Sequence, residues 1–391
     1  MVNVFIIGLR GYTQDYGGWE TFVHGLINNW TYEDVHFYAF EKVKSKSEEC
    51  IVEVDGVTCI RISEQTKGSS AMMRYDAHSL DYTIKYVREH GIENPVAFIL
   101  GMRIGPYVML RRNALRKNGI ATVVNPAGIE WKRTKWGKPV QVYLLVSALT
   151  MAVSVDCLAC DSRGVLDVYD KMLKIRRPRL TYATYGAEKP VAEYKNVSVK
   201  VKSFLEQYGL EPDGYYLVVG RFVPENNYEM MLKGFMLSNT SRKLLIITNI
   251  ETELGKFRKH IEDTTHYKDD GRIVMAGTLY DQEILQYLRF NAHGYIHGHS
   301  VGGTNPGLLE AMSATKLNIL YDVPFNKEVG GDACLYFIDK VSLAHALEIA
   351  DGMDCEEIDA YGKAASNRME TLYSWSVIAG QYHDLFTSIT V

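Results

Sequence analysis

The chain contains 391 residues, which is more than one compact core usually serves and enough for two domains of about 150 to 200 residues each. With 47% hydrophobic and 23% charged residues, its composition is that of a globular protein and excludes wholesale disorder. Lysine and arginine total 43 against 47 aspartate and glutamate, a formal net charge of −4. This balance argues against a polybasic nucleic-acid binder, so we expect no nucleic-acid partner.

Short apolar runs alternate with helix-length amphipathic segments through the first half of the chain. The predicted strands cover residues 2–8, 36–40, 96–100, 122–125 and 157–161, and the predicted helices cover 18–29, 70–90, 105–117 and 139–155. Because parallel strands need such crossover helices, the alternation predicts a parallel α/β sheet. The apolar run at 140–155 is short for a membrane span, and we expect a buried helix there.

A second series of the same kind begins after the polar segment 185–196, which suits a linker. Its predicted strands cover 215–220, 243–248, 272–276, 294–297 and 317–321, and its predicted helices cover 227–237, 254–263, 281–290 and 305–314. The predicted fold class is therefore α/β, with two Rossmann-like, doubly wound domains at 1–190 and 191–370. Ligands of such sheets bind at the strand carboxyl ends, in a cleft between the two domains.

The cysteines and the first residues bear on the cellular compartment. Of six cysteines, only Cys157 and Cys160 are spaced like metal ligands, and no second pair completes a zinc site. The first apolar run reads as a strand and lacks the basic region of a signal peptide. We expect reduced thiols, no metal and a cytoplasmic protein.

Positive charge is concentrated in one part of the first domain. From residue 103 to residue 179 there are 15 Lys and Arg against five acids. Solvated helix faces explain any single cluster, but several clusters interleaved with tryptophan favour an anionic partner such as the cytoplasmic leaflet of a membrane. The candidate contact residues are Arg111, Arg112, Arg116, Lys132, Arg133, Lys135 and Trp136.

Glycines follow the first predicted strand. Gly17 and Gly18 precede a predicted helix, but the chain has no G-x-G-x-x-G fingerprint here, which disfavours a nicotinamide-dependent oxidoreductase. Glycines in this position allow a backbone loop to approach a ligand closely, and the helix start adds N–H donors for an anion.

The second domain carries the strongest signals of an anion site. Arg221 follows a strand and precedes a helix, a position from which arginine can grip phosphate with two hydrogen bonds. Farther along, the strand ending at His297 is followed by the loop Gly302-Gly303-Thr304-Asn305 and by Pro306, which suits a first helical position. This pattern predicts backbone N–H groups that face a diphosphate, with Glu310 one turn into the helix and near a nucleotide sugar hydroxyl.

These motifs resemble those of known enzymes. The order Gly-Arg-x-Val-Pro-Glu, then a glycine-rich loop ending in Leu-Leu-Glu-Ala-Met, is similar to retaining glycosyltransferases of family 4, which have the two-domain GT-B fold. More narrowly, YGGWETFV at 16–23, EWKRTKW at 130–136, GGTNPGLLEAM at 302–312 and DVPFNKEVGGDACLYF at 322–337 resemble bacterial rhamnosyltransferases. Those enzymes act in streptococcal cell-wall and capsular polysaccharide synthesis.

The resemblance implies a donor, an acceptor and roles for residues. The donor would be dTDP-L-rhamnose, with Arg221 and Asn226 at the diphosphate, Gly302 to Asn305 cradling it, and Glu310 on the deoxyribose 3′-hydroxyl. Gly17 and Gly18 would close over the donor. The acceptor would be a GlcNAc-diphospho-lipid at the inner face of the plasma membrane, and no metal or other cofactor would be needed. The last residues, 371–391, would form a helix that crosses back to the first domain.

Three positions depart from the family pattern. Asn226 stands where lysine is usual, Gly302 stands where glutamate is usual, and Ala127 stands where related proteins carry aspartate in an Asn-Pro-Asp-Gly segment. An aspartate at a strand's carboxyl end is a natural acceptor base, and alanine cannot replace it. Our hypothesis is that position 127 is catalytic and disabled in this chain. Glu130 is the nearest remaining carboxylate, and a structural ion pair is an equal alternative for it.

Other functions stay open at this level. The same fold could use a UDP-sugar donor, or the chain could be a catalytically silent binder of nucleotide sugar or lipid acceptor. A sugar-nucleotide epimerase of the same fold would consume donor without an acceptor.

Overall fold

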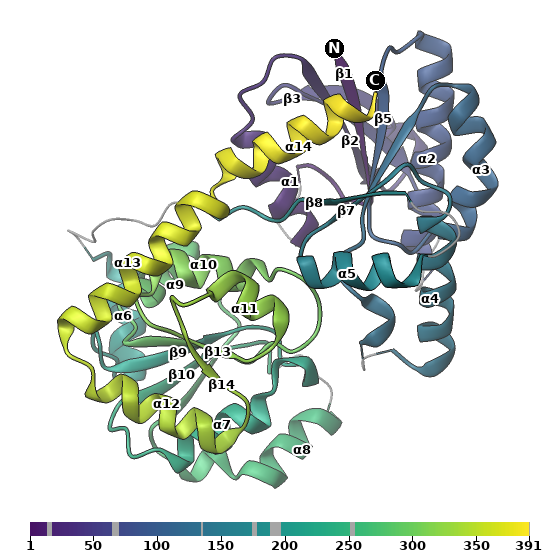
Figure 1. The fold of residues 1–391 in the computed structure, drawn as a ribbon. Coiled ribbons are helices and arrows are strands. Elements are labelled where there is room, and N and C mark those ends of the chain that lie inside the picture. Colours follow the sequence, from purple (N-terminus) through teal and green to yellow (C-terminus); the bar gives the residue numbers. More distant parts are fainter. Residues whose placement is uncertain are drawn as a thin grey trace. The chain divides into compact units, whose positions relative to one another are not determined.

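The computed structural model describes residues 1–13, 18–64, 70–133, 136–173, 178–187, 197–250 and 255–390 (Figure 1). The chain divides into two compact units. Unit 1 comprises Met1–Gly186 and Trp375–Val391, and unit 2 comprises Ala187–Ser374.

Unit 1 contains an eight-stranded sheet with the order β3-β4-β2-β1-β5-β6-β7-β8. All neighbouring strands are parallel except β3 and β4, which form an antiparallel pair. The strands are β1 Val2–Ile7, β2 Val35–Val43, β3 Cys50–Val54, β4 Val57–Ser63, β5 Pro95–Leu100, β6 Ala121–Asn125, β7 Cys157–Cys160 and β8 Arg179–Tyr182.

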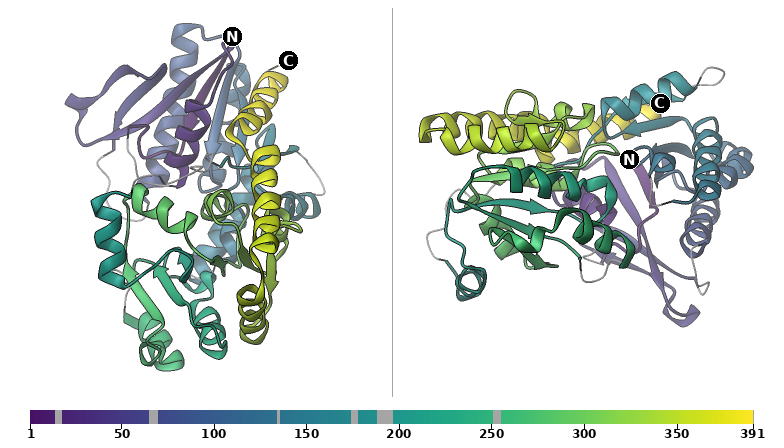
Figure 2. Two further views of the ribbon diagram at one scale, coloured as in Figure 1. Left: turned by 90° about the vertical axis from the view of Figure 1, so that its left-hand side faces the viewer. Right: turned by 90° about the horizontal axis from the view of Figure 1, so that it is seen from below.

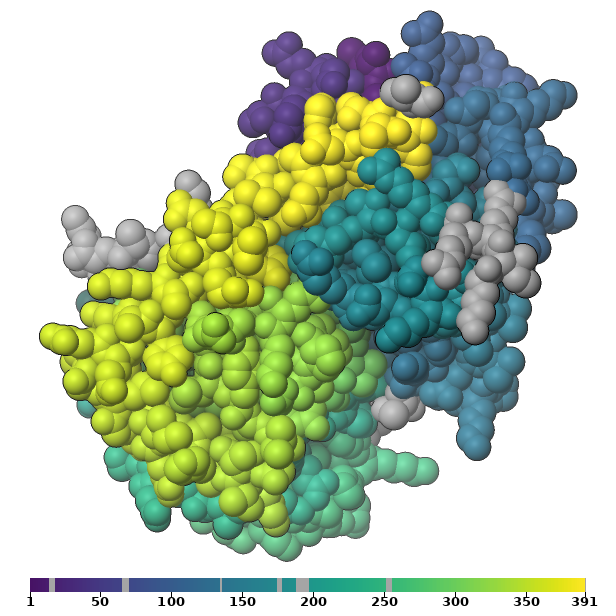
Figure 3. Space-filling model, in the orientation of Figure 1, coloured from purple at the N-terminus to yellow at the C-terminus, as the bar shows by residue number. Residues whose placement is uncertain are grey.

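The helices of unit 1 cover this sheet. They are α1 Gly18–Asn28, α2 Ala71–His90, α3 Gly105–Lys117, α4 Lys138–Ala152, α5 Arg163–Met172 and the last helix, α14 Trp375–Ile389, with 3-10 turns η1 Lys46–Glu48 and η2 Glu130–Lys132. Helix α14 lies along the surface of unit 1 (Figure 3) and packs against α1 and β1. A Cβ added to Gly25 of α1 would come within 2.0 Å of the Trp375 ring, so only glycine admits this close approach.

Unit 2 contains a six-stranded, wholly parallel sheet with the order β11-β10-β9-β12-β13-β14. The strands are β9 Tyr215–Val219, β10 Lys243–Ile247, β11 Ile273–Gly277, β12 Gly294–His297, β13 Asn318–Tyr321 and β14 Leu335–Phe337. The helices are α6 Val199–Tyr208, α7 Tyr228–Leu237, α8 Gly255–Thr265, α9 Gln282–Phe290, α10 Pro306–Ala314, α11 Pro324–Gly330, α12 Lys340–Gly352 and α13 Cys355–Leu372, with η3 Pro224–Asn226 and η4 Tyr267–Asp269.

Helices cover both faces of this second sheet (Figure 2). One core joins Tyr216 and Leu244 of the sheet to apolar residues of α7, α8 and α12. The opposite core joins Tyr215 and Leu245 to residues of α6, α9 and α10. Alternate residues of one strand therefore serve opposite cores, and both sheets are doubly wound, as the alternating pattern predicted.

Some elements escaped the sequence analysis. Strands β3 and β4 were missed although their connection is Asp55-Gly56, both with positive φ (50° and 78°), a two-residue hairpin turn with a recognisable sequence signal. The short strands β8 and β14 and several helices were missed as well.

The expectation of a buried helix at 140–155 is wrong for its first half. From Lys138 to Val146 no residue of α4 is buried, and the side chains of Val142 and Val146 are 61% and 47% exposed. Only the second half, around Ala148 and Met151, enters the core, because only that half lies against α3 and the sheet. Within the described ranges, no helix has the length and apolarity needed to cross a bilayer.

Candidate functional site

The candidate site of unit 2 lies where the winding of its sheet reverses. From β9 the chain proceeds through β10 to β11 on one side, whereas β12, β13 and β14 follow on the other. Ligands of open α/β sheets bind at the carboxyl ends of the strands at such a switch point. The segments after β9 and β12 meet there, since the Ser300 N–H and hydroxyl both donate to the Glu225 carbonyl at 2.9 Å.

Arg221 presents a free cation at this edge. Its side chain is exposed and forms no ion pair with any described residue. The backbone beneath it is held, because Asn226 Nδ2 donates to the Arg221 carbonyl at 2.7 Å, and Nδ1 of His299 lies 2.7 Å from Asn226 Oδ1. Asn226, which the sequence analysis placed at the diphosphate, thus braces the backbone of Arg221.

The loop after β12 needs glycine at two points. A Cβ on Gly298 would lie 2.4 Å from the Asn226 carbonyl oxygen, so this approach of the two loops requires glycine. Gly302 has φ +135°, which side-chain-bearing residues rarely adopt. In the same loop, the N–H groups of Val301, Gly302 and Gly303 donate no hydrogen bond to any described residue.

The start of α10 is less open than the sequence predicted. Asn305 caps the helix by accepting from the Gly307 N–H at 2.9 Å, and its carbonyl accepts from the Leu308 N–H at 3.0 Å. Thr304 beside it is buried. The donors left for an anion therefore come from the loop at 301–303 rather than from the first turn of the helix.

Glu310 is fixed by a residue that the sequence analysis missed. It forms an ion pair with Arg289 of α9, whose side chain is buried, whereas that of Glu310 is 39% exposed. The sequence could have indicated this pair. Arg289 follows Leu285 by one helical turn on the buried face of α9, and a buried charge needs a partner.

His297 is a buried group with an unused nitrogen. It is the last residue of β12, and its Nε2 has no hydrogen-bond partner among the described residues. Burial, with a smaller contribution from His299, lowers its pKa to about 3, so the ring is neutral near pH 7.

The predicted catalytic position, Ala127, lies in unit 1 after β6 in the left-handed region, with φ 58°. Of the described non-glycine residues with positive φ, the other five are Asp, Asn or His: Asp55, Asn94, Asp213, Asn227 and His266. Short polar residues tolerate this conformation because their side chains hydrogen-bond locally, which alanine cannot do. The backbone at position 127 therefore suits the aspartate, asparagine or glycine that the sequence lacks.

Other predicted residues of unit 1 have structural partners. Glu130 lies 2.8 Å from Arg133 Nε and accepts from Trp136 Nε1 at 2.9 Å. Arg111 lies 2.8 Å from Asp81. By contrast, Arg112, Arg116 and Lys132 form no ion pair with a described residue. Gly18 starts α1 and is exposed, whereas Gly17 and Lys135 lie outside the described residues.

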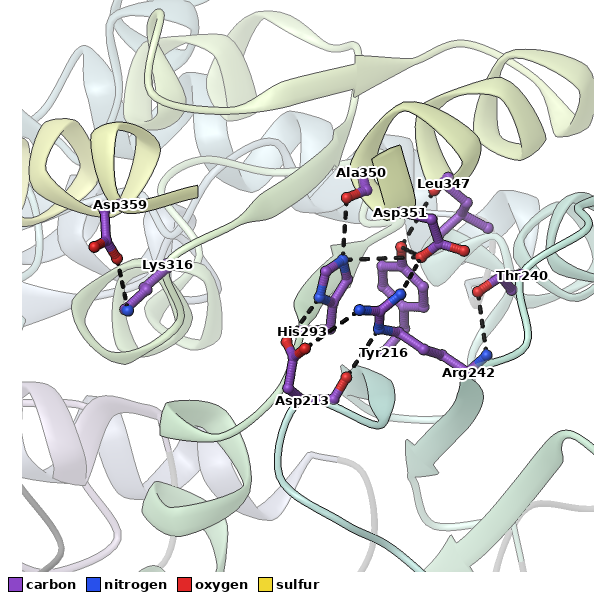
Figure 4. Close-up of polar contacts among 10 residues, drawn as sticks. All are labelled: Asp213, Tyr216, Thr240, Arg242, His293, Lys316, Leu347, Ala350, Asp351 and Asp359. Carbon is purple, nitrogen blue, oxygen red and sulfur yellow. Dashed lines mark hydrogen bonds and ion pairs between the residues drawn. The ribbon is translucent and has the colours of Figure 1, made fainter. Parts of the chain in front are cut away.

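A second polar cluster in unit 2 lies at the amino ends of the strands (Figure 4). His293, just before β12, has Nδ1 2.8 Å from Asp213 and Nε2 3.2 Å from the Ala350 carbonyl, while Arg242 lies 2.8 Å from Asp351. All these groups are mutually satisfied at the edge away from the glycine loop, so the cluster joins α12 to the sheet. Among the described residues, no group of three or more His, Cys, Asp or Glu could hold a metal ion.

Comparisons with known proteins place the fold. A family model described as "Domain of unknown function (DUF1972)" matches residues 1–188. No curated protein sequence matches the chain. Among solved structures, sucrose-phosphate synthase from Thermosynechococcus elongatus aligns with a TM-score of 0.75 at 17% identity over 99% of both chains.

Two further structures align over nearly the same length. HepE from Anabaena, solved in complex with UDP, has a TM-score of 0.71 at 11% identity, over 99% of this chain and 100% of that one. An α,α-trehalose-phosphate synthase (UDP-forming) from Burkholderia xenovorans, solved with glucose-6-phosphate, has 0.71 at 13% identity over 99% of both chains. These likenesses show the GT-B fold, so the predicted fold class of two Rossmann-like α/β domains is confirmed.

Proposed function

We propose that the protein is a glycosyltransferase that moves L-rhamnose from dTDP-L-rhamnose to a GlcNAc-diphospho-lipid in cell-surface polysaccharide synthesis. The GT-B fold supports the general activity, since the structurally similar proteins include sugar-phosphate synthases and a protein solved with UDP. The rhamnosyl donor and the lipid-linked acceptor rest on the sequence motifs that resemble bacterial rhamnosyltransferases.

One observation carries the proposal: the unused N–H groups of residues 301–303 and the exposed Arg221 lie at one switch point. A nucleotide diphosphate gains negative charge as the sugar leaves, and fixed N–H dipoles and a guanidinium stabilise that charge. The proposed reaction needs no metal or cofactor besides the nucleotide sugar. Glu310, held by Arg289, keeps an exposed carboxylate for a sugar hydroxyl of the nucleotide.

A second candidate keeps the fold and changes the donor. Similar structures include one bound to UDP-2-fluoro glucose and HepE in complex with UDP, which favours UDP-sugars as the alternative donors. The decisive experiment incubates the full chain with a GlcNAc-diphospho-lipid analogue and either dTDP-rhamnose or UDP-glucose, and reads products by mass spectrometry. A deoxyhexose mass gain supports the proposal, a hexose gain supports the second candidate, and nucleotide binding without any transfer identifies a silent binder.

The proposed acceptor requires contact with a membrane, and unit 1 offers a surface for it. Residues 105–155 contain eight Lys and Arg and a single acid, Glu130. On α3 and α4 the apolar side chains of Leu110, Val142 and Val146 are 71%, 61% and 47% exposed. An apolar helix face with unpaired cations beside it fits the anionic inner leaflet, where each cation adds about 1 kcal/mol. We place the protein in the cytoplasm, peripheral at the inner face of the plasma membrane.

A further inference from the structure

Unit 1 has a switch point of its own, at β1 and β5. From β1 the chain continues to β2 on one side and later to β5, β6, β7 and β8 on the other. Gly8 follows β1 with φ +114°, and a Cβ there would lie 2.8 Å from the Leu100 carbonyl oxygen at the end of β5. The backbones at the ends of β1 and β5 therefore approach closely at the edge where ligands of such sheets bind.

The segment after β5 is a braced loop that carries Arg103. The Gly101 N–H donates to the Asn125 carbonyl at 2.8 Å, and the Ser147 hydroxyl donates to the Met102 carbonyl at 2.6 Å. The Tyr143 hydroxyl donates to the Arg103 carbonyl at 2.9 Å. Bonds from β6 and α4 thus fix the backbone from which the Arg103 side chain projects.

The Arg103 guanidinium is clamped on one side and open on the other. Its Nε lies 2.6 Å from Asp76 Oδ2, and its Nη2 donates to the Gly8 carbonyl at 3.3 Å. The side chain of Asp76 is 2% exposed, whereas that of Arg103 is 30% exposed. One side of the cation therefore faces a buried carboxylate, and part of it stays accessible at the carboxyl edge.

Asp76 is costly to bury. Its Oδ1 has no hydrogen-bond partner among the described residues. Burial raises the pKa of this carboxyl to about 6, although Arg103 acts in the opposite direction. A carboxylate held at such cost beside one arginine suits a role in orienting that arginine. A second cation, Arg10, is exposed in the loop after β1 and forms no ion pair with a described residue.

We infer that Arg103 binds a phosphate group of the acceptor substrate and that Asp76 is the positioning residue that aims it. The inference rests on the proposed transferase function and adds the residues that hold the acceptor's phosphate. Arginine recognises phosphate through a planar pair of N–H donors, which needs the orientation that Asp76 and Gly8 impose. The phosphate could belong to a lipid-linked diphosphate or to a soluble sugar phosphate.

Transfer kinetics test this assignment with three acceptors: a GlcNAc-diphospho-lipid analogue, GlcNAc 1-phosphate and phosphate-free octyl GlcNAc. We expect Arg103→Gln to raise KM at least about 10-fold for the acceptor whose phosphate it binds, with kcat and the donor KM changed less than about 3-fold. An effect on the lipid-linked acceptor alone identifies that source, and an effect on both phosphates shows that either fits. Octyl GlcNAc should be unaffected, and equal losses with all three acceptors would overturn the inference.

Matched variants separate binding from folding. Arg88→Gln, in the last turn of α2 and exposed, is the control and should change nothing. Arg103→Lys keeps the charge without the planar donors and should give an intermediate KM. Asp76→Asn should raise the KM for phosphate acceptors while leaving octyl GlcNAc unchanged, a split that a merely structural role would not produce.

A binding experiment stands apart from turnover. Calorimetric titration of the full chain with inorganic diphosphate should show two sites, of which Arg103→Gln removes one and Arg221→Gln the other. If no sugar is transferred but the Arg103-dependent site remains, the proposed function fails and the anion site stands. If transfer occurs and Arg103→Gln changes neither KM nor diphosphate binding, the inference fails and the function stands.

Discussion

The two switch points of this molecule share a topology but offer anions different chemistry. At β9 and β12 in unit 2, a glycine-rich loop presents bare N–H groups beside an exposed Arg221. At β1 and β5 in unit 1, the cation is a single arginine clamped by buried Asp76. Backbone donors suit a constant group such as a nucleotide diphosphate, and an oriented side chain can be adapted to a particular acceptor. The same edge of the same architecture can therefore be specialised by its loops.

The pKa values of the buried titratable groups at the two edges are shifted in opposite directions. Burial lowers the pKa of His297 to about 3 in unit 2 and raises that of Asp76 to about 6 in unit 1. Each group is pushed towards its neutral form, because a low-dielectric interior disfavours either charge. The two units should consequently respond to acid in opposite directions at these residues.

The largest expected effect concerns Ala127. This residue lies at the carboxyl edge of the sheet in unit 1, and its methyl side chain cannot act as a base. Ala127→Asp should raise turnover by at least about 10²-fold if the carboxylate acts as a base. Ala127→Asn and Ala127→Gly are the matched controls, because both accept φ 58° but neither takes a proton. Transfer rates of the four forms decide the matter: equal rates remove position 127 from the mechanism, and equal gains in all three variants assign the effect to the backbone.

Acid should sharpen the contrast between the buried groups. In the folded protein the pKa of His297 is lowered from 6.5 to about 3, so below pH 6.5 the unfolded chain binds a proton that the folded chain does not. The free energy of unfolding therefore falls as the pH falls, by about 3 kcal/mol at pH 4.5. In the folded protein the pKa of Asp76 is raised from 3.8 to about 6, so the stability contributed by its protonated form is lost as the pH rises through 6. On acidification from pH 7 to pH 4.5 this contribution increases the free energy of unfolding by about 2 kcal/mol.

Urea unfolding at pH 7 and pH 4.5 measures both contributions. His297→Gln should lose less stability on acidification than the parent chain, and Asp76→Asn should lose more. The difference between the two pH values is the readout, so a constant cost of either substitution cancels. Unchanged pH dependence in both variants would contradict the burial argument.

Arg221→Gln should weaken binding of dTDP and UDP by roughly 10- to 100-fold, because hydrogen bonds to a charged group contribute about 1.5 to 3 kcal/mol. The side chain is exposed, so stability should change by less than about 0.5 kcal/mol. Arg258→Gln on α8, which removes a partly exposed i,i+4 ion pair with Glu262, is the control in the same unit. Nucleotide affinity that is the same in both variants would exclude Arg221 from the diphosphate site.

The proposed membrane surface can be broken without touching either switch point. The double variant Val142→Asp, Val146→Asp should reduce binding to phosphatidylglycerol-containing vesicles by at least about 10-fold, since burying each valine contributes about 1.5 kcal/mol or more. Both side chains are exposed, so the melting temperature should hardly move. Val199→Asp on α6 of unit 2, 79% exposed, is the control. Vesicle binding that survives the double variant places the membrane contact elsewhere.

The sequence pattern predicted those helices, strands and loops whose formation depends on nearby residues alone. Alternating apolar runs predicted both sheets, and the glycine-rich loop before Pro306 was predicted to present backbone N–H groups to a diphosphate because glycines permit a close approach and Pro306 suits a helix start. The first half of α4 was misjudged, because an apolar helix can be buried by the protein's own core or left for another surface, and composition is the same in both cases.

The sequence alone was enough to predict the alternation of strands and helices, the two doubly wound units and the segments at their carboxyl edges. Which side chains pair at those edges follows from the packed structure alone. Asp76 and Arg103 come from different elements, as do Arg289 and Glu310, and their pairing depends on how helices pack on the sheet. The left-handed backbone at Ala127 could not be predicted from the sequence either. Periodicity records which face of an element is apolar, whereas distance, burial and charge pairing arise only once distant segments are packed together.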